Sequence, residues 1–206
     1  MSKIQTNTIQ HTANGAAVFT LPTSDGSANQ VLKTDGSGNL AFTTITDTDT
    51  VGLSMADQWR IHSEFTFSAS GSVITSNWER VDTDGFGQLG TGMTESSGVF
   101  SFPTTGIYYI NFFGTGRRNS GNDRYGQIDL QTTADNSNYG QTASFYVTAP
   151  SQYNRNTGAL SFIMDVTDVS NQKFRFYQYE AWGTLIFQGS TNTNYNGLTV
   201  LRLGDT

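Results

Sequence analysis

The chain has 206 residues, a formal net charge of -6, no cysteine and only 14% charged residues. The length suffices to bury a large core, the absence of cysteine excludes disulfides and thiolate metal sites, and the acidic balance argues against the basic stripe of a nucleic-acid binder. No apolar run reaches the ~18 residues of a membrane-spanning helix, so we expect no membrane insertion.

The first fifty residues form a separate segment with few apolar side chains. Of the 26 aromatic residues in the chain, only Phe19 and Phe42 lie in it. Two Asp-Gly pairs, at Asp25 and Asp35, are hairpin signals. They separate three predicted short strands, at residues 17–21, 31–32 and 40–42. Because an isolated ribbon of this size is marginal in water, residues 1–50 should be stable only against other chains.

This ribbon resembles a recurrent module in tail-fibre and other virion proteins of tailed phages. Residues 21–26 and 30–40 carry the resemblance. It implies attachment to other virion proteins and a location in the virion, after synthesis in the host cytoplasm. An amino terminus without the apolar segment of a secretory signal agrees with that route. The candidate anchor residues are Val18, Phe19, Leu21, Val31, Leu32, Leu40 and Phe42.

Residues 43–50 form a polar connector to a much more aromatic second part. Its first segment leaves two alternatives open: a helical turn capped by Ser54, or a strand beginning near Trp59. Short apolar stretches between Gly-rich turns then predict an all-β sandwich or barrel. The further predicted strands are 59–67, 73–81, 87–91, 99–102, 107–114, 125–131, 143–149, 160–166, 173–179, 184–187 and 198–203.

Residues 98–113 contain the spacing G-x-F-x-F-P-x-x-G-x-Y. This spacing resembles the signature of the globular heads of complement component one q and the related tumour-necrosis-factor-like proteins. Residues 77–81, 160–166, 171–179 and 196–203 resemble other strands of these heads, in the same order. The resemblance covers about residues 57–206. It implies that residues 51–206 form a ten-stranded jelly-roll sandwich, assemble as a homotrimer, and serve recognition or adhesion.

The long strand of the signature is apolar on both faces. Tyr108, Ile110 and Phe112 alternate with a second apolar set, and Asn111 is the one polar exception. One face can fill a sandwich core, whereas the other needs a second cover, for which a neighbouring subunit is the simplest choice. The candidate trimer-interface residues are Ile107, Tyr109, Phe113 and, on a later strand, Tyr177 and Tyr179.

No motif indicates catalysis, and we predict neither a catalytic residue nor a cofactor. The two histidines, His11 and His62, are in no nucleophile motif. The Asp82–Gly85 turn invites a calcium interpretation, but the other ligands of a calcium loop are missing, so no metal is expected. Asp165 and Asp168, or Asp82 and Asp84, offer pairs for glycan cleavage, yet sequence spacing does not establish such a pair.

The loop after the signature strand contains several arginines, which suit the carboxylate or phosphate groups of surface sugars. A solvated hairpin loop, or arginines paired with acids of a neighbouring subunit, are the alternatives. Scattered tyrosine and tryptophan side chains, each an apolar ring with one polar group, favour interfaces and sugar stacking. The candidate receptor contacts are Arg117, Arg118, Arg124, Tyr139, Tyr153 and Trp182, with a host glycan or protein as partner.

Together these patterns predict a non-enzymatic structural protein of a tailed-phage particle. Three weak sites on one trimeric head would multiply its effective affinity. A tail fibre, a head fibre and a capsid decoration all fit the sequence equally. A carbohydrate-degrading tailspike and a cellular lectin, monomeric or oligomeric, are the alternatives.

Overall fold

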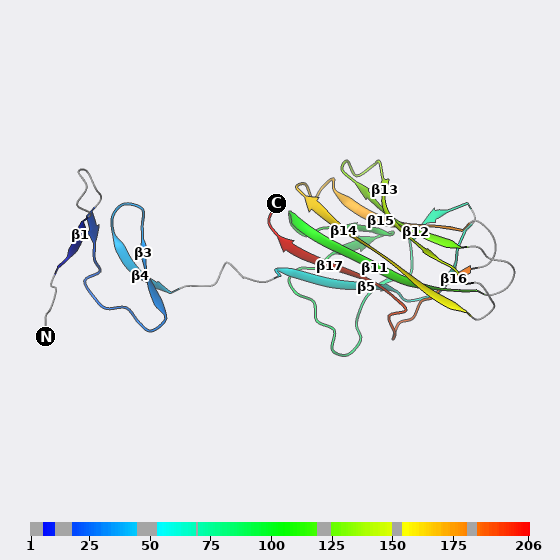
Figure 1. Cartoon of the computed structure of the whole chain (residues 1–206), viewed down its shortest axis with the longest axis horizontal. Helices are drawn as coiled ribbons and strands as arrows, with labels where there is room; N and C mark the ends of the chain where they lie inside the picture. Colours follow the sequence, from blue (N-terminus) through cyan, green and yellow to red (C-terminus); the bar gives the residue numbers. More distant parts are fainter. Residues whose placement is uncertain are drawn as a thin grey trace. The chain divides into compact units, whose positions relative to one another are not determined.

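The computed structural model describes residues 6–10, 18–44, 53–68, 70–118, 125–149, 154–180 and 185–206, apart from the side chain of Glu180. The chain divides into two compact units, Met1–Thr50, here the ribbon unit, and Val51–Thr206, here the head (Figure 1). No helix occurs in the described residues, whose regular structure consists of β-strands. The predicted all-β class is confirmed.

The ribbon unit contains two separate antiparallel strand pairs. In one, β1 (Thr8–Gln10) pairs with β2 (Val18–Thr20); in the other, β3 (Gln30–Thr34) pairs with β4 (Leu40–Thr44). Asp35 closes the second hairpin, because its carboxylate accepts hydrogen bonds from the backbone N–H groups of Ser37 and Asn39 and from the Asn39 amide. The second Asp-Gly pair therefore forms the predicted hairpin.

The first Asp-Gly pair does not form one. Asp25 and Gly26 connect β2 to β3, which belong to different strand pairs, and the Asp25 carboxylate accepts from the Gly26 N–H. The strand that pairs with β2 is β1, which the prediction missed because its residues are mostly polar. A turn signal specifies a local reversal, whereas the pairing of the flanking strands depends on the hydrogen-bonding edges available.

The head is a sandwich of two antiparallel sheets. The β11 sheet has the order β6-β16-β11-β17-β5-β8, with β14 on the free side of β11. Figure 1 shows β14, β11, β17 and β5 side by side in one layer. Its strands are β5 (Met55–Ile61), β6 (Phe65–Thr66), β8 (Trp78–Arg80), β11 (Gly106–Arg118), β14 (Arg155–Val166), β16 (Leu185–Phe187) and β17 (Asn196–Gly204).

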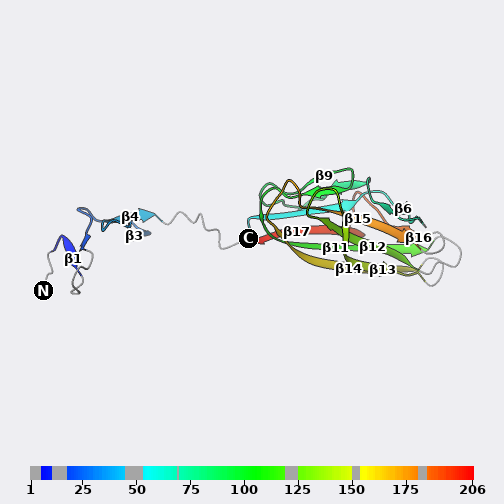
Figure 2. The same cartoon turned by 90° about the horizontal axis from the view of Figure 1, so that it is seen from above.

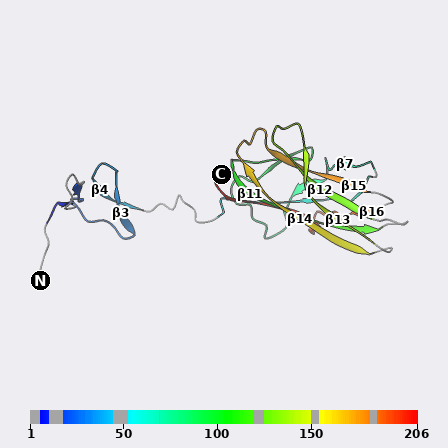
Figure 3. The same cartoon turned by 45° about the horizontal axis from the view of Figure 1, so that its top comes forward.

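The second layer, the β12 sheet, has the order β13-β12-β15-β10-β9, with β7 also pairing with β15. Figure 2 shows the head from above, and Figure 3 shows β13 and β14 running along the same edge of the sandwich. At this edge Phe145 packs against Gly158, where a side chain would collide with its ring. The strands are β7 (Ser72–Val73), β9 (Thr94–Ser96), β10 (Val99–Ser101), β12 (Gly126–Thr133), β13 (Gly140–Val147) and β15 (Lys173–Glu180).

The core between the sheets is mainly aromatic. Trp78 packs against three of its phenylalanines, with ring centroids 5.0 Å from Phe100, 5.5 Å from Phe176 and 5.7 Å from Phe112. Its indole N–H donates to the backbone carbonyl of Ile74 at 2.9 Å, so the one polar atom of this ring is satisfied in the core. The residues that the sequence placed on the core face of β11 are all fully buried: Tyr108, Ile110 and Phe112.

Steric constraints explain why both positions of the signature are glycine. Gly98 has φ 83° and Gly106 has φ 145°, values that side chains disfavour. A Cβ at Gly106 would lie 2.6 Å from the carbonyl oxygen of Gly204, and one at Gly98 would collide with the carbonyl of Ile74. The two glycines thus bring the backbone of the signature against two segments that are distant in sequence.

Several predicted strand boundaries are wrong. Residues from Ser54 form no helical turn, because β5 begins at Met55, and the expected strand 59–67 is split into β5 and β6. The strand expected at 73–81 is split into β7 and β8 before Asn77, whose φ of 67° cannot continue a strand. Residues 87–91 contribute only an isolated bridge between Leu89 and Ala56.

Candidate interaction surfaces

The outer face of the β11 sheet carries the second apolar set of the signature strand. Ile107, Tyr109 and Phe113 are half-buried there. Strand register places Tyr109 between Ile163 of β14 and Leu201 of β17. Ile163 is 58% exposed, which is unusual for an isoleucine at the middle of a strand. We call Ile163, Tyr109 and Leu201 the apolar row.

Beside the apolar row, two amide side chains of this face have hydrogen-bond partners within the chain. Asn111 donates to the backbone carbonyl of Leu160 at 3.2 Å, and Gln58 donates to the Thr199 hydroxyl at 3.1 Å. In the next row the Phe113 ring lies on Gly197, where a Cβ would approach it to 2.7 Å. These two amides can therefore be covered without losing a hydrogen-bond partner.

A loop between β8 and β9 stands beside this face. Arg60 of β5 holds this loop in place, because its guanidinium is fully buried and bonds to Glu79, Asp82 and the Thr83 hydroxyl. Phe86 lies between two cavities of about 260 and 400 Å³, the smaller of which also reaches Leu201. The acidic turn that suggested calcium thus holds an arginine.

Tyr177 and Tyr179 lie on the other sheet. Both are on the outer face of β15, opposite Asp129 and Gln127 of β12. The Tyr177 hydroxyl packs against Gly71, which has no room for a side chain. Because the outer faces of the two sheets point away from each other, the structure does not bring these tyrosines together with Tyr109.

The described receptor-contact candidates lie at two opposite ends of the sandwich. Arg117 lies at the end of β11 and binds both carboxylate oxygens of Glu64, at 3.0 and 3.1 Å; Arg118 pairs in register with Leu185 of β16. Tyr139 follows β12 at the opposite end of the sandwich, 4.0 Å below the Arg175 guanidinium, and burial raises the pKa of its hydroxyl. Arg124, Tyr153 and Trp182 lie outside the described residues, as does His11.

Three aspartates with lowered pKa values share one turn design. In each, the carboxylate accepts from backbone N–H groups and from the amide of a nearby asparagine: Asn39 for Asp35, Asn138 for Asp135, and Asn171 for Asp168. These hydrogen bonds favour the ionised form. Asp168, one of the carboxylates considered for glycan cleavage, is thus occupied in holding a turn.

Most of the candidate anchor residues are exposed on the ribbon unit. Val18, Phe19, Val31, Leu32 and Phe42 are between 37 and 45% exposed, and Leu21 and Leu40 are half-buried. Strand register places Leu32 opposite Phe42. Two-stranded pairs have no second layer to cover such side chains, so the unit presents apolar surface to its surroundings.

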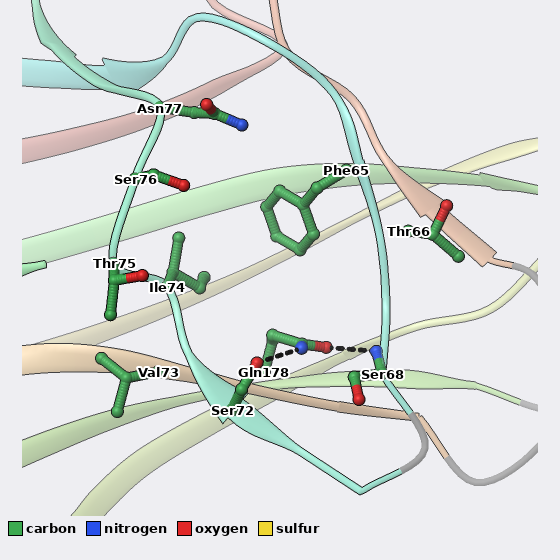
Figure 4. Close-up of a pocket in the computed structure, with 10 residues that line it drawn as sticks. All are labelled: Phe65, Thr66, Ser68, Ser72, Val73, Ile74, Thr75, Ser76, Asn77 and Gln178. Carbon is green, nitrogen blue, oxygen red and sulfur yellow. Dashed lines mark hydrogen bonds between the residues drawn. The ribbon is translucent and has the colours of Figure 1, made fainter.

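A cavity of about 290 Å³ lies between β6 and β7 at the edge of the head (Figure 4). Sequence analysis did not predict this cavity, because its wall residues carry no recognisable motif and Gln178 is about a hundred residues from the others. Its lining residues are Phe65, Thr66, Ser68, Ser72, Val73, Ile74, Thr75, Ser76, Asn77 and Gln178.

Among the described residues, no group of three or more potential metal ligands occurs. The same residues contain no helix long and apolar enough to cross a membrane.

Solved structures show which fold this sandwich has. The Eiger tumour-necrosis-factor protein of S. frugiperda matches with a TM-score of 0.53 and 11% identity, over 75% of this chain and 96% of that one. Murine APRIL matches with a TM-score of 0.52 and 9% identity, over 72% and 98%. The globular domain of zebrafish complement 1qA matches at 0.47 and 12%, over 74% and 99%.

The head therefore has a jelly-roll fold of the tumour-necrosis-factor type, and the expected jelly-roll fold is confirmed. At these identities the likeness concerns the fold alone. No protein-family model matches the sequence, and no curated protein matches it.

Proposed function

We propose that this protein is a non-enzymatic structural and recognition protein of a tailed-phage particle, with a trimeric head and an anchoring ribbon unit. The apolar row on the outer face of the β11 sheet carries the proposal. Ile163 is 58% exposed and Tyr109 and Leu201 are half-buried, and such a partly exposed apolar stripe supports a surface that a protein partner covers.

Two features support a second copy as that partner. The sequence resemblance to complement-q-type heads implies a homotrimer. The polar groups next to the apolar row, Asn111 and Gln58, already have hydrogen-bond partners within the chain. A subunit can dock there without leaving them unsatisfied.

The ribbon unit supports the anchoring role. Its strand pairs expose apolar side chains such as Leu32 and Phe42, and such pairs gain stability by packing on another protein. The phage-fibre resemblance of residues 21–40 proposes other virion proteins as that support and the virion as the location. The carbohydrate-degrading alternative calls for a carboxyl with a raised pKa, whereas hydrogen bonds lower the pKa of Asp168, one of its candidate carboxylates.

Light scattering after size exclusion tests the trimer. One chain has a mass of 22.5 kDa, so a trimer has three times 22.5 kDa, about 67.5 kDa. A folded species of 22.5 kDa would contradict the proposal. Mass spectrometry of purified particles of the encoding phage tests the second part: full-length chain should be present, and a chain lacking residues 1–50 should be absent from particles while its head remains trimeric.

A further inference from the structure

We propose that the cavity between β6 and β7 binds one uncharged sugar residue. The inference rests on the proposed recognition role, to which it adds a ligand class and a site. The site differs from the predicted arginine loop, and it favours a different kind of sugar. Its support comes from the shape of the cavity, the chemistry of its walls and the rigidity of its base.

Apolar and polar walls face each other across the cavity. Figure 4 shows the Phe65 ring extending into it from one wall and the hydroxyls of Thr75 and Ser76 directed toward the ring from the other. A pyranose has the same two-sided character, with C–H groups on its faces and hydroxyls around its rim. Phe65 can stack on the C–H face while the hydroxyls bond to the rim.

The base of the cavity is held in place before any ligand arrives. Gln178 is only 4% exposed; its Oε1 accepts from the Ser68 backbone N–H, and its Nε2 donates to the Ser72 hydroxyl, both at 2.7 Å. One buried amide thus fixes two sides of the cavity (Figure 4). At the rim, the Asn77 carbonyl accepts from the His62 N–H at 2.8 Å. A preformed site loses little entropy on binding.

The wall chemistry selects an uncharged ligand. None of the ten lining residues carries a charge, so an anionic or cationic ligand would lose hydration without gaining an ionic partner. Among the described residues, no hydrogen bond engages the hydroxyls of Thr66, Thr75 and Ser76, which both donate and accept. Sugar hydroxyls need partners of that dual kind.

The size of the cavity limits the ligand to one residue. Its volume of about 290 Å³ is at the lower end of the range for small-molecule sites, roughly 300–1,000 Å³. A hexose ring fits such a space, and further residues of a glycan would extend into solvent. We therefore expect weak binding of monosaccharides, with Kd on the order of 1 mM, which a trimer would strengthen on a glycan-covered surface.

Saturation-transfer NMR on the full chain tests the site. The probes are methyl glycosides of glucose, galactose, mannose and N-acetylglucosamine, with N-acetylneuraminic acid as the charged comparison. Ser76→Phe should fill the cavity and weaken binding at least tenfold, and Thr75→Val should weaken it several-fold by removing one hydroxyl. Ser137→Phe is the matched control, because Ser137 is an exposed serine in the turn between β12 and β13; it should bind like the wild type.

Three results would overturn the proposal: no transfer from any neutral glycoside to the wild type, unchanged binding by Ser76→Phe, or preferred binding of the charged sugar. Light scattering of the same samples separates this proposal from the trimer. A trimer that binds no glycoside removes only the sugar site, whereas a monomer that binds one removes only the trimer. If Ser76→Phe unfolds the head, the smaller substitution Thr75→Val still tests the site.

Discussion

Arg80 holds the carboxylate of Asp57 with two parallel hydrogen bonds, from Nε to Oδ1 at 3.0 Å and from Nη2 to Oδ2 at 3.1 Å. The Asp57 side chain is fully buried, and the same carboxylate also accepts from the Trp59 indole and from the Met93 backbone N–H. One buried charge thereby connects β5, β8 and the segment that leads into β9.

Arg80→Ala should therefore destabilise the head by about 3 kcal/mol, because it leaves a buried carboxylate without its cation. It also removes the guanidinium from the face of Trp59, 4.7 Å away. Urea unfolding of the protein measures the change. Arg155→Ala, at an exposed arginine of β14, should shift the free energy of unfolding by less than about 0.5 kcal/mol. Equal effects of the two variants would contradict the role of Arg80 as the cation that stabilises the buried carboxylate.

Gly114→Ala should destabilise the head by about 1–3 kcal/mol through overpacking. Gly114 is buried in β11 against the ring of Phe187, and a Cβ there would collide with that ring. Gly140→Ala is the matched change in β13, where no atom lies within 4 Å of the added Cβ. It should be neutral or slightly stabilising in thermal unfolding. A neutral Gly114→Ala would show that Phe187 packs elsewhere.

Ile163→Asp should convert the trimer to folded monomers. The side chain is 58% exposed in the single chain, so the monomer loses little, whereas a covered interface would bury an unpaired charge. Light scattering should report 22.5 kDa with an unchanged β-sheet circular dichroism spectrum. Tyr146→Asp, 54% exposed on the β12 sheet, should stay trimeric. Tyr109→Ser with Phe113→Ser should also dissolve the trimer; a double variant that stays folded and trimeric would refute the interface.

Acid should weaken the head in part through its aspartate turns. Asp135 and Asp168 have pKa values below the ordinary 3.8, because backbone N–H groups and asparagine amides bond to their carboxylates. Their contribution to stability is present above that value and is lost as the pH falls through the lowered pKa values. Asp135→Asn with Asp168→Asn should lower Tm at pH 6, and the difference from the wild type should shrink as the pH falls below 3.8. Asp84→Asn is the control, because this exposed carboxylate accepts no hydrogen bond among the described residues; it should leave Tm at pH 6 unchanged.

The fold was predictable where local pattern determines structure. The alternation of β11 follows from the side-chain period of a strand, so Tyr108 was correctly placed in the core. The division after residue 50 follows from the distribution of aromatic residues, and the hairpin at Asp35 follows from turn chemistry. The predicted strand boundaries were wrong at Asn77, whose left-handed backbone conformation interrupts an otherwise strand-like run of residues.

The surfaces depended on which strands pair. Tyr177 resembles Tyr109 in sequence context, yet its strand belongs to the other sheet, and only long-range hydrogen bonding decides that. The cavity needs Phe65 and Gln178 to meet from distant segments. By itself, the sequence determined the β class, the two units and the core face of β11, because these follow from periodicity and composition. The tertiary structure alone decided which outer face carries each aromatic residue and where the neutral cavity lies, because register between distant strands sets both.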